Sequence, residues 1–316
     1  MGKIFDALEK SKKRDSTSLA TNKTFGTVSK GQTEKQEASF DRNEIRNKGN
    51  AGAAFLRKEI DKSEYPQRES HVIPIDKTEV LYDENKIDQN LIVHLRPNSF
   101  EAEQFKILRT NLLFPSSGKS PRSIMVTSAV PDEGKSFVSA NLAASIAQSI
   151  QEHVLLVDCD IRVPTIHKLF GFGNVPGLSD HLANGASLPS LILGTSVNKL
   201  SILPGGKPPH NPSELLSSQL MSKLLQEVKY RYSDRYIVID SPPPKLTAET
   251  AALSRQVDGV LLVVECGTTP RKIVLDLIEM IGKEKILGII LNKLDTQFVS
   301  YSGLGKYKKY GKYYKS

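Results

Sequence analysis

A short segment ending in Gly134-Lys135-Ser136 has the residue types of a phosphate-binding loop. It follows the apolar run 123–127 and precedes a run of small and apolar residues, so a strand, a tight turn and a helix N-terminus are predicted here. Backbone N–H groups converge at such a turn, and the helix dipole favours an anion there. We therefore predict a nucleotide site built from Pro131, Asp132, Glu133, Gly134, Lys135, Ser136 and Phe137.

Two side chains of this loop suit ATP and Mg²⁺, which we predict as the cofactors. Lys135 can neutralise the outer phosphates, and the Ser136 hydroxyl can ligate the metal. The strict pattern G-x-x-x-x-G-K-[ST] fails at its first position, where Ala129 stands. The simpler alternative, a chance Gly-Lys-Ser at a strand–helix turn, is disfavoured by the flanking strand and helix.

Three aspartates follow two other apolar runs. The run 154–157 leads into Asp158 and Asp160, and the run 236–239 leads into Asp240. Ligands of an open parallel sheet bind at the carboxyl ends of its strands. A carboxylate there can bind Mg²⁺ or accept a proton from an attacking hydroxyl. A single Asp would be explained by a capped turn, but three beside a phosphate loop favour a functional site.

From residue 100 onward, helices and strands alternate. This pattern predicts an α/β P-loop NTPase fold, with a mostly parallel sheet covered by helices on both faces. The predicted strands are 123–128, 154–158, 200–204, 236–240, 260–264 and 286–291. The predicted helices are 100–113, 135–149, 164–170, 213–229, 247–256 and 270–282.

The ends of the chain differ from this nucleotide-binding domain, which we expect at 91–298. Residues 1–90 have the polar composition of a disordered arm, with a short amphipathic helix predicted at 1–14. That helix could dock on a partner or an anionic membrane, or fray without a partner. With no apolar stretch of eighteen residues and no signal peptide, a cytoplasmic protein is expected. Cys159 and Cys266 are expected as reduced, buried residues.

The flexible tail predicted at 299–316 is basic and aromatic. Residues 301–316 hold five lysines, no acidic residue and five of the ten tyrosines. The whole chain has a net charge of +8, and the central domain has nearly equal numbers of basic and acidic residues. A DNA-binding face is therefore not predicted on the domain, and we expect no nucleic-acid partner. Composition leaves three roles for the tail: binding of single strands, contact with an anionic membrane, or presentation of tyrosine hydroxyls as phosphoryl acceptors.

From about residue 98 to the end, the sequence closely resembles the bacterial tyrosine kinases of capsule and exopolysaccharide biosynthesis and export. Segment 131–136 matches that family's form of the Walker A motif, in which the first glycine is often absent. Segment 158–162 matches its D-x-D-x-R motif, and 239–243 matches its Walker B segment. The tyrosine-rich tail stands where the family places its autophosphorylation cluster.

This resemblance implies an ATP-dependent protein-tyrosine autokinase, a transferase, with assigned roles. Lys135, Asp158, Asp160 and Asp240 are the implied catalytic residues. Asp158 is the candidate base, although a metal-ligand role is nearly as well supported. The implied metal ligands are Ser136, Asp160 and Asp240; Arg162 and Asn292 are further nucleotide contacts. Asn292 would meet the adenine, or is an ordinary turn residue.

The resemblance also implies partners. Glu103, Lys106 and Arg109 would lie on a helix that joins subunits of a ring, for which an octamer is one candidate size; in the alternative, Glu103 and Lys106 pair locally on a solvated face. A membrane-bound polysaccharide chain-length regulator would activate the kinase and hold it at the inner membrane. The acceptors between subunits would be Tyr301, Tyr307, Tyr310, Tyr313 and Tyr314.

Two other function classes are alternatives to the kinase. A ParA/MinD-like ATPase switch for partitioning or positioning shares the fold, but such switches usually carry a second lysine early in the loop, where this chain has Val130. A switch also has no need of a tyrosine tail. A more remote alternative is a non-catalytic scaffold bound to a membrane partner.

Overall fold

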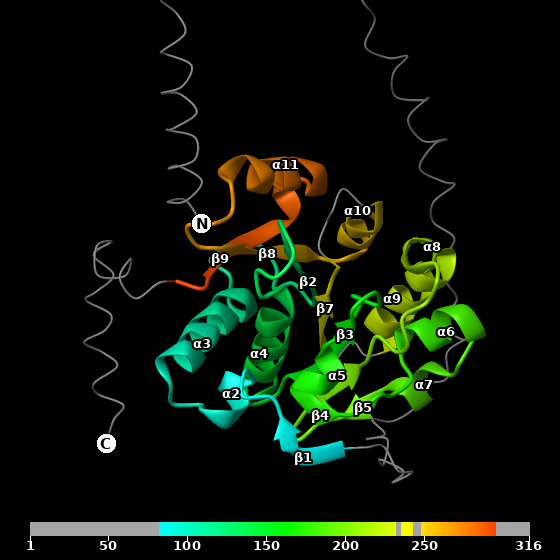
Figure 1. The fold of residues 1–316 in the computed structure, drawn as a ribbon. Helices are drawn as coiled ribbons and strands as arrows, with labels where there is room; N and C mark the ends of the chain where they lie inside the picture. The colour runs from blue at the N-terminus through cyan, green and yellow to red at the C-terminus, as the bar shows by residue number, and fades with distance from the viewer. Residues whose placement is uncertain (1–81, 232–234, 243–247, 295–316) are drawn as a thin grey trace, which may run out of the picture. The chain divides into compact units, whose positions relative to one another are not determined.

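A computed structural model describes residues 82–231, 235–242 and 248–294 (Figure 1). The helix predicted at 1–14, the arm up to residue 81 and the five tail tyrosines lie outside these residues. Residues 82–90, which composition assigned to the arm, form a strand and a turn instead. Strand β1 (Tyr82–Ile87) pairs antiparallel with β4 (Phe170–Phe172). The Tyr82 and Phe172 rings are 5.1 Å apart, so apolar contacts anchor this part of the predicted arm to the domain.

In the described part of the chain, the main sheet has seven strands in the order β5-β6-β3-β7-β2-β8-β9. All neighbours are parallel except β5 and β6, which confirms the mostly parallel sheet. Strand β5 was missed by the sequence prediction because it has only two residues. The strands span Ser123–Ser128 (β2), His153–Asp158 (β3), Leu193–Gly194 (β5), Leu200–Leu203 (β6), Arg235–Asp240 (β7), Gly259–Glu265 (β8) and Ile286–Asn292 (β9).

Helices cover both faces of the sheet (Figure 1). On β2, Met125 packs into one apolar cluster with α9, α10 and α11, whereas Ile124 and Val126 pack into another with α3 and α4. The helices span Ile92–Leu95 (α2), Phe100–Leu113 (α3), Lys135–Ala147 (α4), Ile166–Leu169 (α5), Leu178–Asn184 (α6), Leu188–Leu191 (α7), Pro212–Leu216 (α8), Gln219–Arg231 (α9), Ala248–Gln256 (α10) and Arg271–Ile281 (α11), with a 3₁₀ turn at Lys283–Lys285.

One predicted helix is divided in two. The helix expected at 213–229 forms as α8 and α9, which are separated by Ser217 and Ser218. The Ser218 hydroxyl accepts the backbone N–H of Met221 at 3.1 Å, so it starts a new helix rather than continuing the first. Within the described residues, no helix is both long and apolar enough to span a bilayer.

Candidate nucleotide-binding and catalytic site

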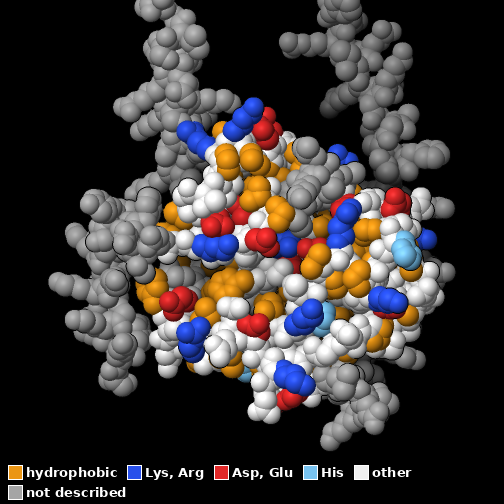
Figure 2. Space-filling model, viewed as in Figure 1, with side chains coloured by type: hydrophobic (Ala, Val, Ile, Leu, Met, Phe, Trp, Pro, Cys, Tyr) orange, Lys and Arg blue, Asp and Glu red, His pale blue; other side chains and the backbone are white. Residues whose placement is uncertain are grey.

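The carboxyl ends of the central strands bring the predicted site residues together. Asp158 at the end of β3 lies directly opposite Asp240 at the end of β7, and the N–H of Cys159 donates to the Asp240 carbonyl at 2.8 Å. The loop between β2 and α4 lies beside them. Figure 2 shows acidic and basic side chains alternating across the middle of this face, between β8 and β3. Two strand ends and one loop therefore form one charged site.

The loop has the backbone conformation of an anion cradle. Gly134 caps α4 with a φ of 90°, and Asp132 also has a positive φ, of 64°. Left-handed residues in a tight turn direct successive N–H groups toward one point, here at the N-terminus of a 13-residue helix. A Cβ at Gly134 would collide with the Asn292 side chain, so the position requires glycine. The departure at Ala129 does not prevent this turn.

Lys135 points into the carboxylate cluster. Its Nζ is 2.9 Å from Oδ2 of Asp160, and both side chains are largely buried. Burial opposes the charged amine, but Asp240 and Asp160 together hold the pKa of Lys135 above its ordinary value. The lysine therefore stays charged at neutral pH, as a phosphate contact requires.

Asp158 is fully buried and accepts three backbone hydrogen bonds. Its Oδ1 accepts the N–H of Asp160, and its Oδ2 accepts those of Thr165 and Ile166, each at 3.1 Å. Burial and the nearby Asp240 carboxylate raise the pKa of Asp158 well above its ordinary value. Such a carboxylate binds a proton more readily than an exposed one, which suits a general base.

Asp240 is also fully buried, and one of its oxygens is suited to a metal. The Ser139 hydroxyl donates to Oδ1 at 3.0 Å, whereas Oδ2 has no hydrogen-bond partner among the described residues. Burial raises the pKa of Asp240 to about 6, against the opposing effect of Lys135. An unpartnered, buried carboxylate oxygen beside Ser136 and Asp160 fits Mg²⁺, which prefers oxygen ligands. Ser139 was not singled out from the sequence, although it lies one helical turn after Ser136.

Other predicted nucleotide contacts face other parts of the protein. The Arg162 guanidinium donates to Oε1 of buried Glu249 and to the Ser213 hydroxyl, each at 2.7 Å. Arg162 thus joins the loop after β3 to α8 and α10. The sequence did not reveal Glu249 as the partner of Arg162, because the two residues are 87 positions apart in the chain. The Phe137 ring packs edge-on against Phe105 of α3.

Glu133 and Asn292 connect the phosphate-binding loop to the ends of β8 and β9. The Glu133 carboxylate is fully buried and accepts hydrogen bonds from protein donors, and Asn292 Nδ2 donates to the Glu133 carbonyl at 2.8 Å. Of the two cysteines, Cys159 is buried as expected, but Cys266 is partly exposed; neither forms a disulfide. Among the described residues, no group of three or more His, Cys, Asp or Glu residues has the arrangement of a metal centre.

The residues predicted for subunit contacts lie on α3. Lys106 Nζ pairs with Glu103 at 3.1 Å, which is the local pairing considered above. Arg109 donates to the Ser145 carbonyl at the end of α4, at 2.8 Å. Ile107 on the same helix is 49 % exposed, so α3 also presents an apolar side chain to its surroundings.

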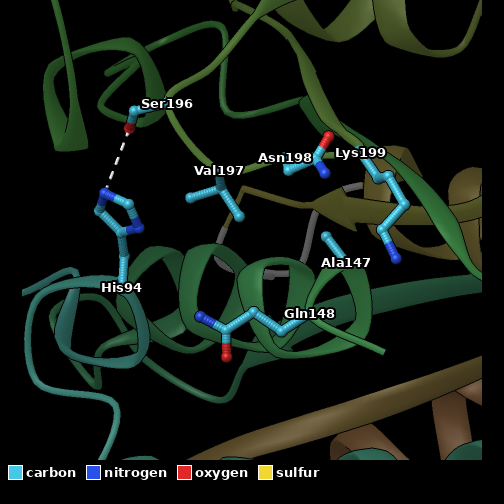
Figure 3. Close-up of a pocket in the computed structure, with 7 residues that line it drawn as sticks. All are labelled: His94, Ala147, Gln148, Ser196, Val197, Asn198 and Lys199. Atoms are coloured by element: carbon cyan, nitrogen blue, oxygen red, sulfur yellow. Dashed lines mark hydrogen bonds between the residues drawn. The ribbon is translucent and has the colours of Figure 1, made fainter. Parts of the chain in front are cut away.

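A separate hollow lies at the C-terminal end of α4, beside the start of β6 (Figure 3). It is formed by His94, the end of α4 and the turn before β6, and the Ser196 hydroxyl lies 3.4 Å from the His94 ring. Lys199 in this hollow donates to the Ser149 and Ile150 carbonyls after α4. These contacts hold the C-terminal end of α4, whereas the phosphate-binding loop lies at its N-terminal end, so the hollow is distinct from the nucleotide site.

Known proteins resemble this chain in both sequence and fold. A family model described as "ParA: NUBPL iron-transfer P-loop NTPase" matches residues 120–302. "Tyrosine-protein kinase YwqD" of Bacillus subtilis is 35 % identical over 231 residues, 72 % of this chain and 93 % of the relative. "Succinoglycan biosynthesis transport protein ExoP" of Rhizobium meliloti is 36 % identical over 69 % of this chain, but only 29 % of that protein. The crystal structure of "the chimerical protein CapA2B2" is 34 % identical, has a TM-score of 0.60, and covers 66 % of this chain and 92 % of its own.

Proposed function

Because this chain belongs to the bacterial tyrosine-kinase family of P-loop NTPases, we propose that it is an ATP-dependent tyrosine autokinase regulating capsule or exopolysaccharide synthesis. The observation that carries the proposal is the juxtaposition of Lys135 with Asp158, Asp160 and Asp240 beside the phosphate-binding loop. Phosphoryl transfer requires mainly positioning and charge compensation, and this cluster provides both.

Each residue has a role in the proposed transfer. Lys135 neutralises the outer phosphates, while Ser136, Asp160 and Asp240 hold Mg²⁺. When bound, Mg²⁺ offsets the charge that develops on the transferred phosphoryl group. Asp158 accepts the proton of the tyrosine hydroxyl while the tyrosine oxygen forms a bond to the γ-phosphorus. The bond between that phosphorus and the β,γ-bridging oxygen breaks, and ADP leaves with its electrons. The raised pKa of Asp158 makes its carboxylate a better proton acceptor than an ordinary aspartate.

The acceptors we propose are Tyr301, Tyr307, Tyr310, Tyr313 and Tyr314, phosphorylated between subunits. The supporting features are their number, the basic residues around them and their position after the last strand of the domain. Each phosphate adds about −1.5 to −2 charges at neutral pH, so about three would cancel the charge of the five lysines. We infer that this change releases the tail from the acidic site and loosens the assembly.

Transfer between subunits can be tested by mixing two variants. The full-length Lys135→Met protein supplies intact tyrosines without a working site, and a protein lacking residues 299–316 supplies the site without the tail. An anti-phosphotyrosine blot should detect phosphate on the full-length chain only when both proteins and ATP·Mg²⁺ are present. A blank full-length band, with the shortened protein active on an added tyrosine peptide, would exclude transfer between subunits.

The proposed assembly is a ring of identical subunits, with an octamer as one candidate size, held at the inner membrane by a membrane-bound activator. Support for the ring comes from the acidic and basic residues spaced three apart on α3, because a head-to-tail contact closes only if each subunit offers both surfaces. The activator is supported by the similarity to the chimerical protein CapA2B2, whose name joins a CapA component to a CapB component.

The alternative is an ATPase switch, which is supported by the match to the ParA family model. Val130 stands where such switches usually carry their second lysine. The two functions differ in the fate of the γ-phosphate. A switch releases it to water, so purified protein that hydrolyses ATP without gaining phosphotyrosine would support the switch over the kinase.

A further inference from the structure

The buried carboxylate of Glu133 links two parts of the nucleotide site. Its Oε2 accepts the backbone N–H of Val130 at 2.8 Å, which closes the loop over three residues. Its Oε1 accepts the backbone N–H of Glu265 at 3.0 Å and the hydroxyl of Thr269. Glu265 ends β8, and Thr269 lies in the turn that leads to α11. The side chain therefore connects the phosphate-binding loop to the neighbouring strand and turn.

This carboxylate is not placed to contact a nucleotide. The Glu133 residue has no solvent exposure, and both of its oxygens accept hydrogen bonds from the protein. A buried carboxylate is costly unless donors compensate it, and here two backbone N–H groups and one hydroxyl do so. A carboxylate turned toward the phosphates would instead repel them. The buried position of the Glu133 carboxylate is therefore explained by the hydrogen bonds that it accepts from the loop and from β8.

Val130, whose N–H donates to the Glu133 carboxylate, stands next to a departure from the usual phosphate-loop pattern. Val130 follows Ala129, where the strict phosphate-loop pattern has its first glycine. We propose that Glu133 is a positioning residue that fixes the phosphate-binding loop in place of that glycine and, through Thr269, ties nucleotide affinity to the turn after β8. A second connection supports the same arrangement, since Asn292 at the end of β9 donates to the Glu133 carbonyl. The inference concerns nucleotide binding and stands whether or not the tail is the kinase substrate.

Glu133→Gln tests the carboxylate with almost no change in shape. The amide of glutamine offers one oxygen, so its NH₂ group must face an N–H or O–H donor on one side. Hydrogen bonds to charged groups contribute about 1.5–3 kcal/mol, which corresponds to roughly tenfold to hundredfold in affinity. We expect Glu133→Gln to weaken the binding of fluorescent N-methylanthraniloyl-ADP with Mg²⁺ by that factor. The matched control is Glu279→Gln, the same change at an exposed position on α11, which should bind within about twofold of the unaltered protein.

Thr269 provides a second test that leaves the loop sequence intact. Thr269→Val removes the hydroxyl and should weaken ADP binding about fivefold to tenfold, whereas Thr269→Ser keeps the hydroxyl and should restore binding. Because the two side chains share one hydrogen bond, the double variant Glu133→Gln/Thr269→Val should lose less affinity than the two single losses combined.

Thermal unfolding of the nucleotide-free variants separates positioning from stability. We expect each variant to unfold cooperatively above the temperature used for binding, so that lost affinity reflects the loop and not unfolded protein. Should Glu133→Gln fail to fold, the Thr269 pair decides the question. Binding within twofold of the unaltered protein for Glu133→Gln, equal binding by the Val and Ser variants, or fully additive losses would each overturn the proposal.

Discussion

Lys135 and Asp160 form an ion pair, with Nζ and Oδ2 2.9 Å apart and side-chain exposures of 14 % and 7 %. The pair holds the lysine beside the phosphate-binding loop. A phosphate that takes over the lysine also frees the aspartate for a metal, so nucleotide and metal are expected to bind together. Breaking such a largely buried pair leaves one charge uncompensated.

Lys135→Met should reduce autophosphorylation by at least about a hundredfold, because the cation that compensates the outer phosphates is lost. Asp160→Asn should cause a similar loss by weakening the Mg²⁺ site. Incorporation of radiolabelled phosphate from ATP by the purified proteins measures both effects. Lys272→Met, a change of an exposed lysine on α11, is the control. Full labelling of either site variant would remove these residues from the catalytic site.

Asp240→Asn should abolish labelling yet stabilise the nucleotide-free protein. The folded-state pKa of Asp240 is raised to about 6 from 3.8, so the folded state binds a proton more tightly than the unfolded state. Its carboxylate therefore costs stability progressively as pH rises from about 4 through 6, and asparagine removes that cost. We expect a gain of about 1–3 kcal/mol at pH 8, or a few degrees in Tm, that shrinks below pH 6. A lower Tm at pH 8 would contradict this.

Changing Glu103 and Arg109 together to alanine should leave monomers, because both members of the proposed contact are removed from α3. Light scattering at several protein concentrations measures the oligomer. Glu101→Ala, at an exposed position on the same helix, should leave the assembly unchanged. Since Arg109 also holds the Ser145 carbonyl, circular dichroism must show that the helices are retained. A persistent oligomer would place the interface elsewhere.

Asp258→Asn should destabilise the domain at neutral pH and matter little in acid. Burial opposes ionisation, but the Lys229 ammonium and the N–H groups of Ser123 and Arg122 outweigh it and hold the pKa of Asp258 below 3.8. The contribution is present above the unfolded-state pKa and is lost as pH falls through the lower folded value. We expect a cost of about 1–2 kcal/mol at pH 7, allowing for partial exposure, that declines below pH 4. Urea unfolding of both proteins at pH 7 and below pH 4 measures this cost. An equal loss of unfolding free energy at the two pH values would refute the ionic explanation.

The nucleotide loop and six of the strands were predictable because their signals are local. Apolar runs buried on both faces, each ending in a carboxylate or a turn, mark parallel strands without knowledge of their neighbours. The placement of Asp158, Asp160 and Asp240 near the loop followed from the general rule that ligands bind at the carboxyl ends of such strands. The family resemblance then supplied roles that spacing could not.

Contacts between distant segments had no such local signal. Insertion of β7 between β3 and β2, which brings Asp240 opposite Asp158, joins strands that are not consecutive in the chain. The pairing of β1 with β4 depends on a few apolar contacts within a polar segment. In the sequence, Glu133 was recognisable only as a charged residue in a loop. Its hydrogen-bond donors at Glu265 and Thr269 lie more than 130 residues away. Local periodicity records which face of an element is buried, whereas the partner of a buried polar group is chosen by packing of the whole domain.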